Sequence, residues 1–258
     1  LAKKIVFDLE DFIFLDRVDS GLSVNPILKF LRTSRRTINL IKSSNYVVTS
    51  SPTLNDYCKD LNFNNQSTFI SSSIDTERFM PNNSYNNNNK VTVGWTGTQS
   101  ALPYLDLLRE PLIDLKKERD FQLLIISNFD YEFPEMDLKV VKWNKLSEVN
   151  DLQKIDIGLY PLPQNDWVLG KSGLKALQYM AIGKPVVATD IGTSKDIITH
   201  MESGYLVSKK EDWVFALRNL IDDIHLREKI GKNARKVVVE RYSLNATKKK
   251  YLEVLNSL

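Results

Sequence analysis

The residues of this chain best suited to chemistry lie in one short stretch of its second half. Lys171, Lys175 and Gln178 are spaced at i, i+4 and i+7, so a helix over residues 171–182 would carry two ammonium groups and an amide on one face. Two like charges at this spacing destabilise an isolated helix by roughly 0.2–0.5 kcal/mol. Lysine is also unfavourable beside the positive end of the helix dipole. A bound anion would relieve both costs, so the stretch favours a phosphate site.

Glycines at the start of this stretch support the same interpretation. A helix N-terminus offers unpaired N–H groups to an anion, and Gly170 and Gly173 would let a ligand approach the backbone closely. Ser172 lies between them and is counted with the site. A solvated lysine face, on a helix packed through Leu174 and Leu177, is the alternative, because a K-x-x-x-K pair is not diagnostic.

The composition is that of an ordinary globular protein. The chain has 258 residues, 42% of them apolar and 26% charged, which is enough for one large core or two modest ones. A formal net charge of +3 is too small to indicate nucleic-acid binding. Acidic residues from Asp8 onward interrupt any signal peptide, and no apolar run is long enough to span a membrane. The single cysteine, Cys58, excludes an intrachain disulfide, so we expect a cytoplasmic protein without a metal site.

The elements that must position the lysine stretch alternate between strands and helices. In a first domain, residues 1–75, we predict strands at 5–9, 46–49 and 68–70 and helices at 26–42 and 53–61. This order suggests a parallel sheet covered by helices. The asparagine-rich tract that follows has strong turn chemistry and no apolar period, so we expect a linker over residues 76–90.

A second α/β series occupies residues 91–242. We predict strands at 91–95, 121–126, 138–141, 155–160, 185–188 and 204–207 and helices at 101–118, 171–182, 193–200, 211–221 and 226–240. The pattern is typical of a doubly wound parallel sheet, that is, of a Rossmann-like α/β domain. Pro111 should kink or divide the first of these helices. The last segment, 243–258, has a separate apolar pattern and could pack back on the first domain.

Ligands of doubly wound sheets bind beyond the carboxyl ends of the strands. After the first strand of the second series comes Gly94-Trp95-Thr96-Gly97-Thr98, which we interpret as a glycine-flanked turn able to seat a phosphate or a sugar, with Ser100 as helix N-cap. A tight strand-to-helix turn is the alternative. Trp143 and Asn144 follow the third strand, where Trp143 could support a base or fill core. A nicotinamide fingerprint, G-x-G-x-x-G, is absent.

Several blocks taken together resemble the donor-binding half of the family 4 (group 1) glycosyltransferases. Residues 71–75 are similar to the family's interdomain Asn-Gly-Val-Asp segment, residues 93–97 to its glycine loop, and residues 170–192 and 204–207 to its donor helix and the strands beyond. The resemblance covers about residues 45–245. It implies a GT-B fold, with a partial N-terminal and a complete C-terminal Rossmann-like domain, and retaining, metal-independent transfer of a sugar from a nucleotide-diphosphate donor.

The resemblance also implies what the protein meets. The donor would be the substrate with no further cofactor, the acceptor a glycan or lipid-linked molecule, and the pathway bacterial surface polysaccharide synthesis. The protein would be cytoplasmic, and peripheral association with the inner face of a membrane is compatible with this. About half of an acceptor domain of roughly 150 residues is present, so we expect the acceptor site to be incomplete.

Two departures from the family pattern affect the site. Gly170 and Gln178 stand where the family often has two glutamates, so the ribose-binding role passes to an amide that still forms hydrogen bonds. The Arg and Lys that often clamp the diphosphate are missing at 99–102, and Lys171 and Lys175 would take their place. No catalytic residue is assigned. The predicted donor site consists of Gly94, Trp95, Thr96, Gly97, Thr98, Trp143, Asn144, Lys171, Ser172, Gly173, Lys175 and Gln178.

Other functions stay open at this point. A nucleotide-sugar epimerase or hydrolase of similar fold would need paired acid and base groups, and Asp166 and Asp190 are not obviously paired. A non-catalytic nucleotide-sugar-binding module is the third candidate. Asp8, Glu10 and Asp11 end the first strand, where they either touch the acceptor or serve as structural caps.

Overall fold

The computed structural model describes residues 3–14, 34–82 and 90–258, which form two compact units. The N-terminal unit comprises Leu1–Ser72, Gln164–Ser172 and Thr247–Leu258, and the C-terminal unit comprises Ser73–Pro163 and Gly173–Ala246. The chain therefore passes between the units four times, at 72/73, 163/164, 172/173 and 246/247. The predicted domain boundaries did not include the return of residues 164–172 to the N-terminal unit.

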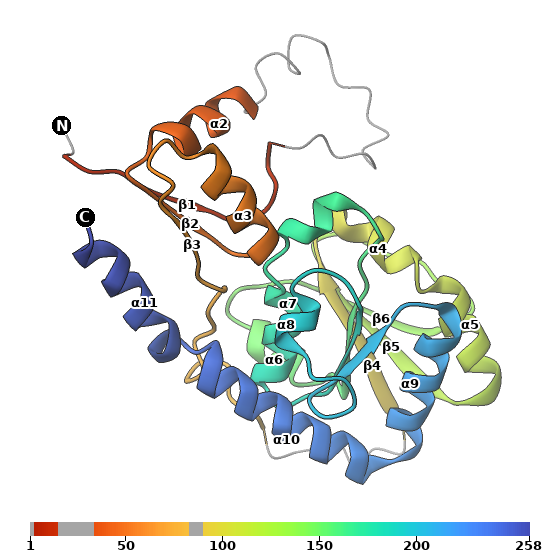
Figure 1. Ribbon diagram of the computed structural model, residues 1–258. Helices are drawn as coiled ribbons and strands as arrows, with labels where there is room; N and C mark the ends of the chain where they lie inside the picture. Colours follow the sequence, from red (N-terminus) through yellow and green to blue (C-terminus); the bar gives the residue numbers. More distant parts are fainter. Residues whose placement is uncertain (1–2, 15–33, 83–89) are drawn as a thin grey trace. The chain divides into compact units, whose positions relative to one another are not determined.

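A three-stranded parallel sheet forms the centre of the N-terminal unit, in the order β1-β2-β3 (Figure 1). Its strands are β1 (Val6–Leu9), β2 (Tyr46–Thr49) and β3 (Ser67–Phe69), close to the predicted bounds. Helix α3 (Pro52–Leu61) begins where the Ser51 hydroxyl accepts a hydrogen bond from the Leu54 N–H at 3.1 Å. Helix α2 (Ser34–Ser43) is the described part of the helix predicted at 26–42, and residues 26–33 lie outside the described residues.

Helices cover both faces of this sheet. Neighbouring residues of β2 pack against different helices, because successive side chains of a strand point to opposite sides. Val47 packs with Leu54 and Cys58 of α3, where burial raises the pKa of the thiol to about 12. Val48 packs on the other face with Val254 of α11 (Leu244–Asn256) (Figure 1). The last helix of the chain thus completes the core of the N-terminal unit.

A six-stranded parallel sheet forms the C-terminal unit, in the order β6-β5-β4-β7-β8-β9. The strands are β4 (Val91–Gly97), β5 (Phe121–Ser127), β6 (Asp137–Lys142), β7 (Ile157–Tyr160), β8 (Val186–Thr189) and β9 (Tyr205–Val207). The chain builds outward from β4 to β6, returns to the centre, and builds the other way from β7 to β9. This is the strand order of doubly wound nucleotide-binding sheets, with its switch point between β4 and β7, so the predicted fold class is confirmed.

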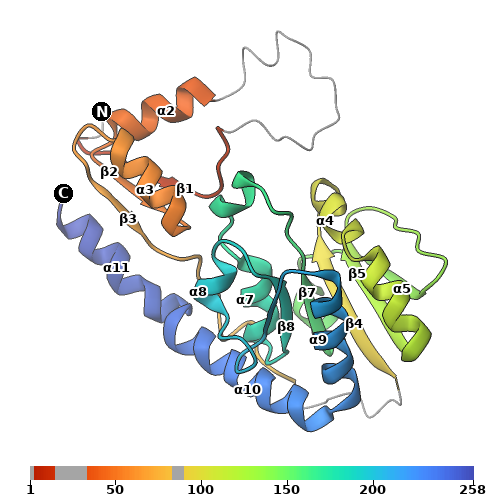
Figure 2. The ribbon, with the colours of Figure 1, turned by 45° about the vertical axis from the view of Figure 1, so that its right-hand side comes forward.

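Two layers of helices enclose this sheet (Figure 2). Helices α5 (Arg109–Glu118) and α9 (Lys210–Asp222) contact each other, and their apolar side chains share a core with the strands. Helix α7 (Leu174–Ala181) contacts β7, β8 and α10 (Ile224–Arg241). A Cβ at Gly158 in β7 would lie 2.4 Å from the ring of Tyr179, so the glycine lets α7 pack closely on the strand.

The helix predicted over residues 101–118 is divided, as Pro111 indicated. It consists of the 3₁₀ turn η1 (Gln99–Ala101), α4 (Leu102–Asp106) and α5. Pro111 lies in the first turn of α5, where its missing N–H breaks no helical hydrogen bond. Two short helices, α6 (Glu148–Leu152) and α8 (Ser194–Ile197), complete the unit, and α6 was not predicted.

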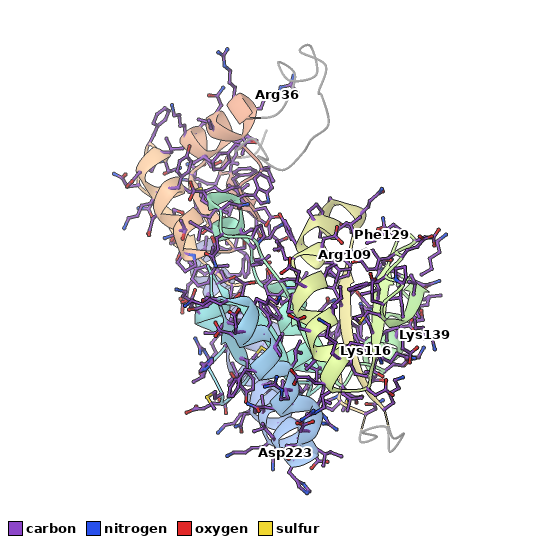
Figure 3. The ribbon with its side chains drawn as sticks, turned by 90° about the vertical axis from the view of Figure 1, so that its right-hand side faces the viewer. Arg36, Arg109, Lys116, Phe129, Lys139 and Asp223 are labelled. Atoms are coloured by element: carbon purple, nitrogen blue, oxygen red, sulfur yellow. The ribbon has the colours of Figure 1, made fainter. Side chains whose placement is uncertain are left out.

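Two basic side chains of α5, Arg109 and Lys116, lie over aromatic rings, and Figure 3 labels both of them, together with Phe129. The Arg109 guanidinium lies 4.5 Å from the centroid of the Phe133 ring, and the Lys116 ammonium lies 5.6 Å from that of Phe121. Phe129 of the same β5–β6 loop makes an edge contact with Trp95 at 6.3 Å. Phe121 begins β5 and Phe133 follows its end, so these contacts cover the core at both ends of the strand.

Lys184, within the segment 170–192 that resembles the family, has a structural role. Its side chain is buried, with 3.8 Å between Nζ and Oδ1 of Asp156, and burial lowers the pKa of this ammonium. The other Asp156 oxygen accepts a hydrogen bond from the Thr92 N–H at 2.9 Å.

None of the helices in the described residues is long and apolar enough to cross a membrane.

Candidate functional site

The candidate site lies at the carboxyl edge of the six-stranded sheet. All its strands are parallel, so the segments that follow β4, β5, β6 and β7 leave the sheet at one edge. Thr98 follows β4, Trp143 follows β6, and the loop after β7 leads to α7. The chain from β6 to β7 passes over β5 and β4, because these strands lie between them, and its Ile155 reaches Gly94 in β4.

The segment interpreted as a glycine-flanked turn belongs to a strand instead. β4 continues to Gly97, which pairs with Ser127 of β5. A Cβ at Gly94 would lie 2.3 Å from Ile155, and Trp95, only 3% exposed, covers Gly97. The prediction of a turn was wrong because the two glycines serve close side-chain packing inside the sheet. Gly94 and Trp95 are thus core residues, and only the end of β4 reaches the candidate site.

The end of β4 is tied directly to α7. The Thr96 N–H donates a hydrogen bond to the Tyr179 hydroxyl at 2.8 Å, and burial raises the pKa of this tyrosine, which stays neutral. Beyond the strand, the exposed Thr98 and Ser100 hydroxyls lie 3.0 Å apart. Ser100 was predicted as a helix N-cap, but Thr98 occupies that position before η1.

Helix α7 begins at Leu174, three residues later than the lysine spacing suggested. Gly173 precedes it with φ of +76°, a left-handed conformation, so the helix does not extend back to Lys171. A Cβ at Gly173 would lie 2.2 Å from Ile197. Lys171 is extended, with φ −66° and ψ 134°. The prediction that Lys171 and Lys175 share a helix face is therefore wrong.

Lys171 and Ser172 belong to the N-terminal unit and pair there. The Lys171 ammonium lies 2.7 Å from Oδ2 of Asp11, and the Ser172 hydroxyl donates to Oε1 of Glu10 at 2.7 Å. These two acidic residues therefore hold the segment 164–172 against the end of β1. Of the two roles considered for Glu10 and Asp11, contact with the acceptor or a structural one, these contacts are structural.

Lys175 instead joins a chain of side chains in the C-terminal unit. Its ammonium donates to Oε1 of Gln178 at 3.2 Å, and Nε2 of Gln178 donates to Oε1 of Glu148 at 3.2 Å. Gln178 and Glu148 are 5% and 9% exposed. Burial lowers the pKa of Lys175, and the charge of Glu148 opposes that shift.

Glu148 accepts two further hydrogen bonds. Nε1 of Trp143 donates to its Oε1 at 3.2 Å, and the Arg78 guanidinium donates to its Oε2 at 2.8 Å. We call these three residues, together with Lys175 and Gln178, the Glu148 cluster. Trp143 is 43% exposed, so it does not fill core, and the adjacent Asn144 is exposed as well.

Sequence reasoning missed Glu148 and Arg78. Arg78 lies within the predicted linker, and Glu148 begins a helix of five residues, too short to show a helical period. The available signal was an acidic residue in the segment that carries Trp143 toward β7. Within the described parts of the chain, no three His, Cys, Asp or Glu side chains lie close enough together to hold a metal ion.

Comparison with known sequences matches one part of the chain to a family. Residues 139–237 match the family described as glycosyl transferases group 1. The D-inositol 3-phosphate glycosyltransferase of Paenarthrobacter aurescens (strain TC1) is 42% identical over 64 residues, 24% of this chain and 16% of that protein. The capsular polysaccharide biosynthesis glycosyltransferase CapM of Staphylococcus aureus is 25% identical over 150 residues, 54% of this chain and 38% of that one. The chain thus spans less than half the length of these curated relatives.

Solved structures agree on the fold. Anabaena Alr3699/HepE, determined in complex with UDP and glucose, aligns over 99% of this chain and 72% of its own, with a TM-score of 0.73 and 17% identity. The two parallel sheets therefore form a GT-B-like fold, as the resemblance implied.

Proposed function

We propose that this chain is a group 1 glycosyltransferase, the family that residues 139–237 match, and that it transfers a sugar from a nucleotide-diphosphate donor. The proposed acceptor is a glycan or lipid-linked molecule, and transfer proceeds with retention and without a metal ion, as in the family it resembles. Similarity to CapM supports a role in surface polysaccharide synthesis. The proposed location is the cytoplasm, including the inner face of the membrane.

The observation that carries the proposal is the position of Lys175. Its partly buried ammonium lies in the first turn of α7, after the central strand β7 and next to the switch point of the sheet. The first N–H groups of a helix have no intrahelical partners and favour an anion. A positive charge in a partly desolvated place stabilises a developing diphosphate better than one in water. Lys175 is therefore the proposed diphosphate ligand.

Neighbouring side chains suit the rest of a nucleotide. Gln178 lies one turn further along α7, and its amide keeps hydrogen-bonding capacity for a ribose hydroxyl. The half-exposed Trp143 ring offers a face for a base. Thr98 and Asn144 are exposed at the same edge of the sheet. Because Lys171 and Ser172 are paired in the N-terminal unit, the proposed donor site is built on the C-terminal unit.

Calorimetric titration with UDP, GDP and ADP tests the proposal. At least one should bind with a dissociation constant below about 1 mM, the upper range for enzyme substrates, and EDTA should leave that affinity unchanged. Failure of all three nucleotides to bind overturns the donor site, and loss of binding in EDTA overturns metal independence. Incubation with the matching nucleotide sugar then tests turnover. Binding without release of nucleoside diphosphate would favour a non-catalytic module.

A further inference from the structure

We propose that Glu148 is a positioning residue of the donor site, one that holds the Gln178 amide and the Trp143 indole in a single arrangement. The identity of the ligand in this inference rests on the proposed function, whereas the hydrogen bonds are independent of it. One Glu148 carboxylate oxygen accepts from both side chains at 3.2 Å, and the other accepts from Arg78 at 2.8 Å. These distances are within the range of N–H···O hydrogen bonds.

The three donors come from parts of the chain that are far apart in sequence. Arg78 precedes β4, Trp143 follows β6, and Gln178 belongs to α7. A buried carboxylate is stable only when hydrogen-bond donors replace the water it has lost. Glu148 therefore favours the one arrangement in which all three segments bring their donors to it.

The two charged neighbours of Gln178 also decide which way its amide faces. A carboxylate such as Glu148 can only accept hydrogen bonds, and an ammonium such as Lys175 can only donate them. The amide nitrogen must therefore face Glu148 and the amide oxygen must face Lys175, as found. One N–H of the amide is then left over, with a fixed direction, to meet a ligand.

The same carboxylate restrains Trp143. Its ring is half exposed, and the hydrogen bond from its Nε1 limits the orientations that the indole can adopt. A side chain that is ordered before binding loses less entropy when a ligand arrives. The proposed base and ribose contacts are thus prepared by a single acidic residue.

Glu148 also accounts for the amide at position 178. A glutamate there, the residue that the family often has, would place two carboxylates within hydrogen-bond distance of each other, where like charges repel. The Glu148 cluster instead combines the cations Arg78 and Lys175 with one carboxylate. Its net charge is +1, which suits an anionic ligand.

A charge-swap experiment tests the positioning without any ligand. Gln178→Glu and Glu148→Gln should each lower the melting temperature by at least roughly 2–4 °C. The double variant Glu148→Gln/Gln178→Glu again pairs one amide with one carboxylate, and should recover at least half of the summed loss. The indole Nε1–H signal of Trp143 should move in the NMR spectrum of Glu148→Gln. Additive losses, or an unmoved indole signal, would overturn the proposal.

A matched control uses Glu202, an exposed glutamate of the same unit. Gln178→Glu combined with Glu202→Gln makes the same change in composition and net charge as the swap. It should give no recovery of the melting temperature. Recovery in this control would show that overall charge, rather than the contact with Glu148, governs the effect.

Ligand titration separates positioning from a merely structural role. Glu148→Gln should weaken the nucleoside diphosphate that binds best, among UDP, GDP and ADP, by about fivefold, the loss of one or two neutral hydrogen bonds. Pyrophosphate, which has neither base nor ribose, should not bind more weakly, because the substitution raises the net charge of the cluster from +1 to +2. Equal effects on the two ligands would overturn the role in the donor site. If no nucleoside diphosphate binds the unaltered protein, the proposed function fails, and the charge swap alone decides whether Glu148 positions Gln178.

Discussion

Two stretches that follow one another in the chain have opposite surroundings. Residues 164–172 belong to the N-terminal unit, where the ammonium of Lys171 pairs with the carboxylate of Asp11. From Gly173 the chain belongs to the C-terminal unit, where the ammonium of Lys175 meets a neutral amide. The first lysine has its charge compensated by the fold. The second brings a charge that a ligand can compensate, and this difference decides which lysine is suited to bind an anion.

The largest expected effect is the loss of nucleotide affinity when Lys175 is replaced. Lys175→Met would remove the proposed charged hydrogen bond to the diphosphate, and such bonds contribute about 1.5–3 kcal/mol. Affinity for the best nucleoside diphosphate should therefore fall by about tenfold or more, as measured by calorimetry. Lys171→Met is the matched control and should change the affinity by less than about threefold, since that ammonium already has an anionic partner. A larger loss for Lys171→Met would reverse the assignment of the two lysines.

Gly173 separates the two stretches, and its replacement should have the next largest effect. Gly173→Ala forces a left-handed conformation on a residue with a Cβ and brings that atom against Ile197, so we expect a destabilisation of about 1–3 kcal/mol. Gly183→Ala is the control, because Gly183 has nearly the same φ, +75°, but its added Cβ would be at ordinary contact distance. Thermal unfolding should show the greater loss for Gly173→Ala. Only this variant should also weaken nucleotide binding, because it alters the start of α7.

The lowered pKa of Lys175 should make both stability and nucleotide affinity depend on pH. Burial lowers the pKa of Lys175 in the folded protein. Between that pKa and the ordinary lysine value the unfolded chain binds more protons, so the free energy of unfolding should rise with pH in this window. A bound diphosphate favours the ammonium, so affinity should fall as the pH rises through the lowered pKa.

Lys175→Arg provides the control for this pH effect, since arginine stays charged. Titrations from about pH 7 to about pH 10 should show a flatter profile for the variant. Identical profiles for the two proteins would mean that Lys175 does not carry the charge that the ligand meets.

The smallest expected effect concerns the stability of the N-terminal unit. Lys171→Met breaks an ion pair whose side chains are 22% and 27% exposed, and pairs with such access to water contribute about 0.2–1 kcal/mol. Chemical denaturation should show a loss in this range. Asp11→Asn should show a similar loss, and the double variant should lose no more than either single variant if the two residues act as a pair. Strictly additive losses would mean that each residue acts through other contacts.

Strand positions were predictable because buried strands leave continuous apolar runs. Tyr46–Thr49 matches its prediction residue for residue, and the strands of the larger sheet fall within two residues of theirs. Pro111 likewise predicted the division of its helix. Proline lacks the N–H needed inside a helix and is tolerated in the first turn, so a new helix begins just before it.

The limits of the helix that carries the site were not predictable from periodicity. Spacing places Lys171 and Lys175 on one face only if the chain is helical throughout, and the left-handed conformation of Gly173, where an added Cβ would meet Ile197, leaves no mark on that spacing. Gly94 and Gly97 misled for a related reason, since glycines that admit neighbouring side chains cannot be distinguished in sequence from glycines of a turn. Glu148 was missed because its hydrogen-bond partners are distant in the chain.

The return of the last helix to the first sheet has a consequence for synthesis on the ribosome. The C-terminal unit is complete once residue 246 has emerged, whereas Val48 and Ile70 still await Val254. Domains generally fold as units as the chain is made. The unit that holds residues 1–72 therefore completes its core after the other unit has been synthesised, and a chain truncated after residue 246 would lack the helix that covers one face of the three-stranded sheet.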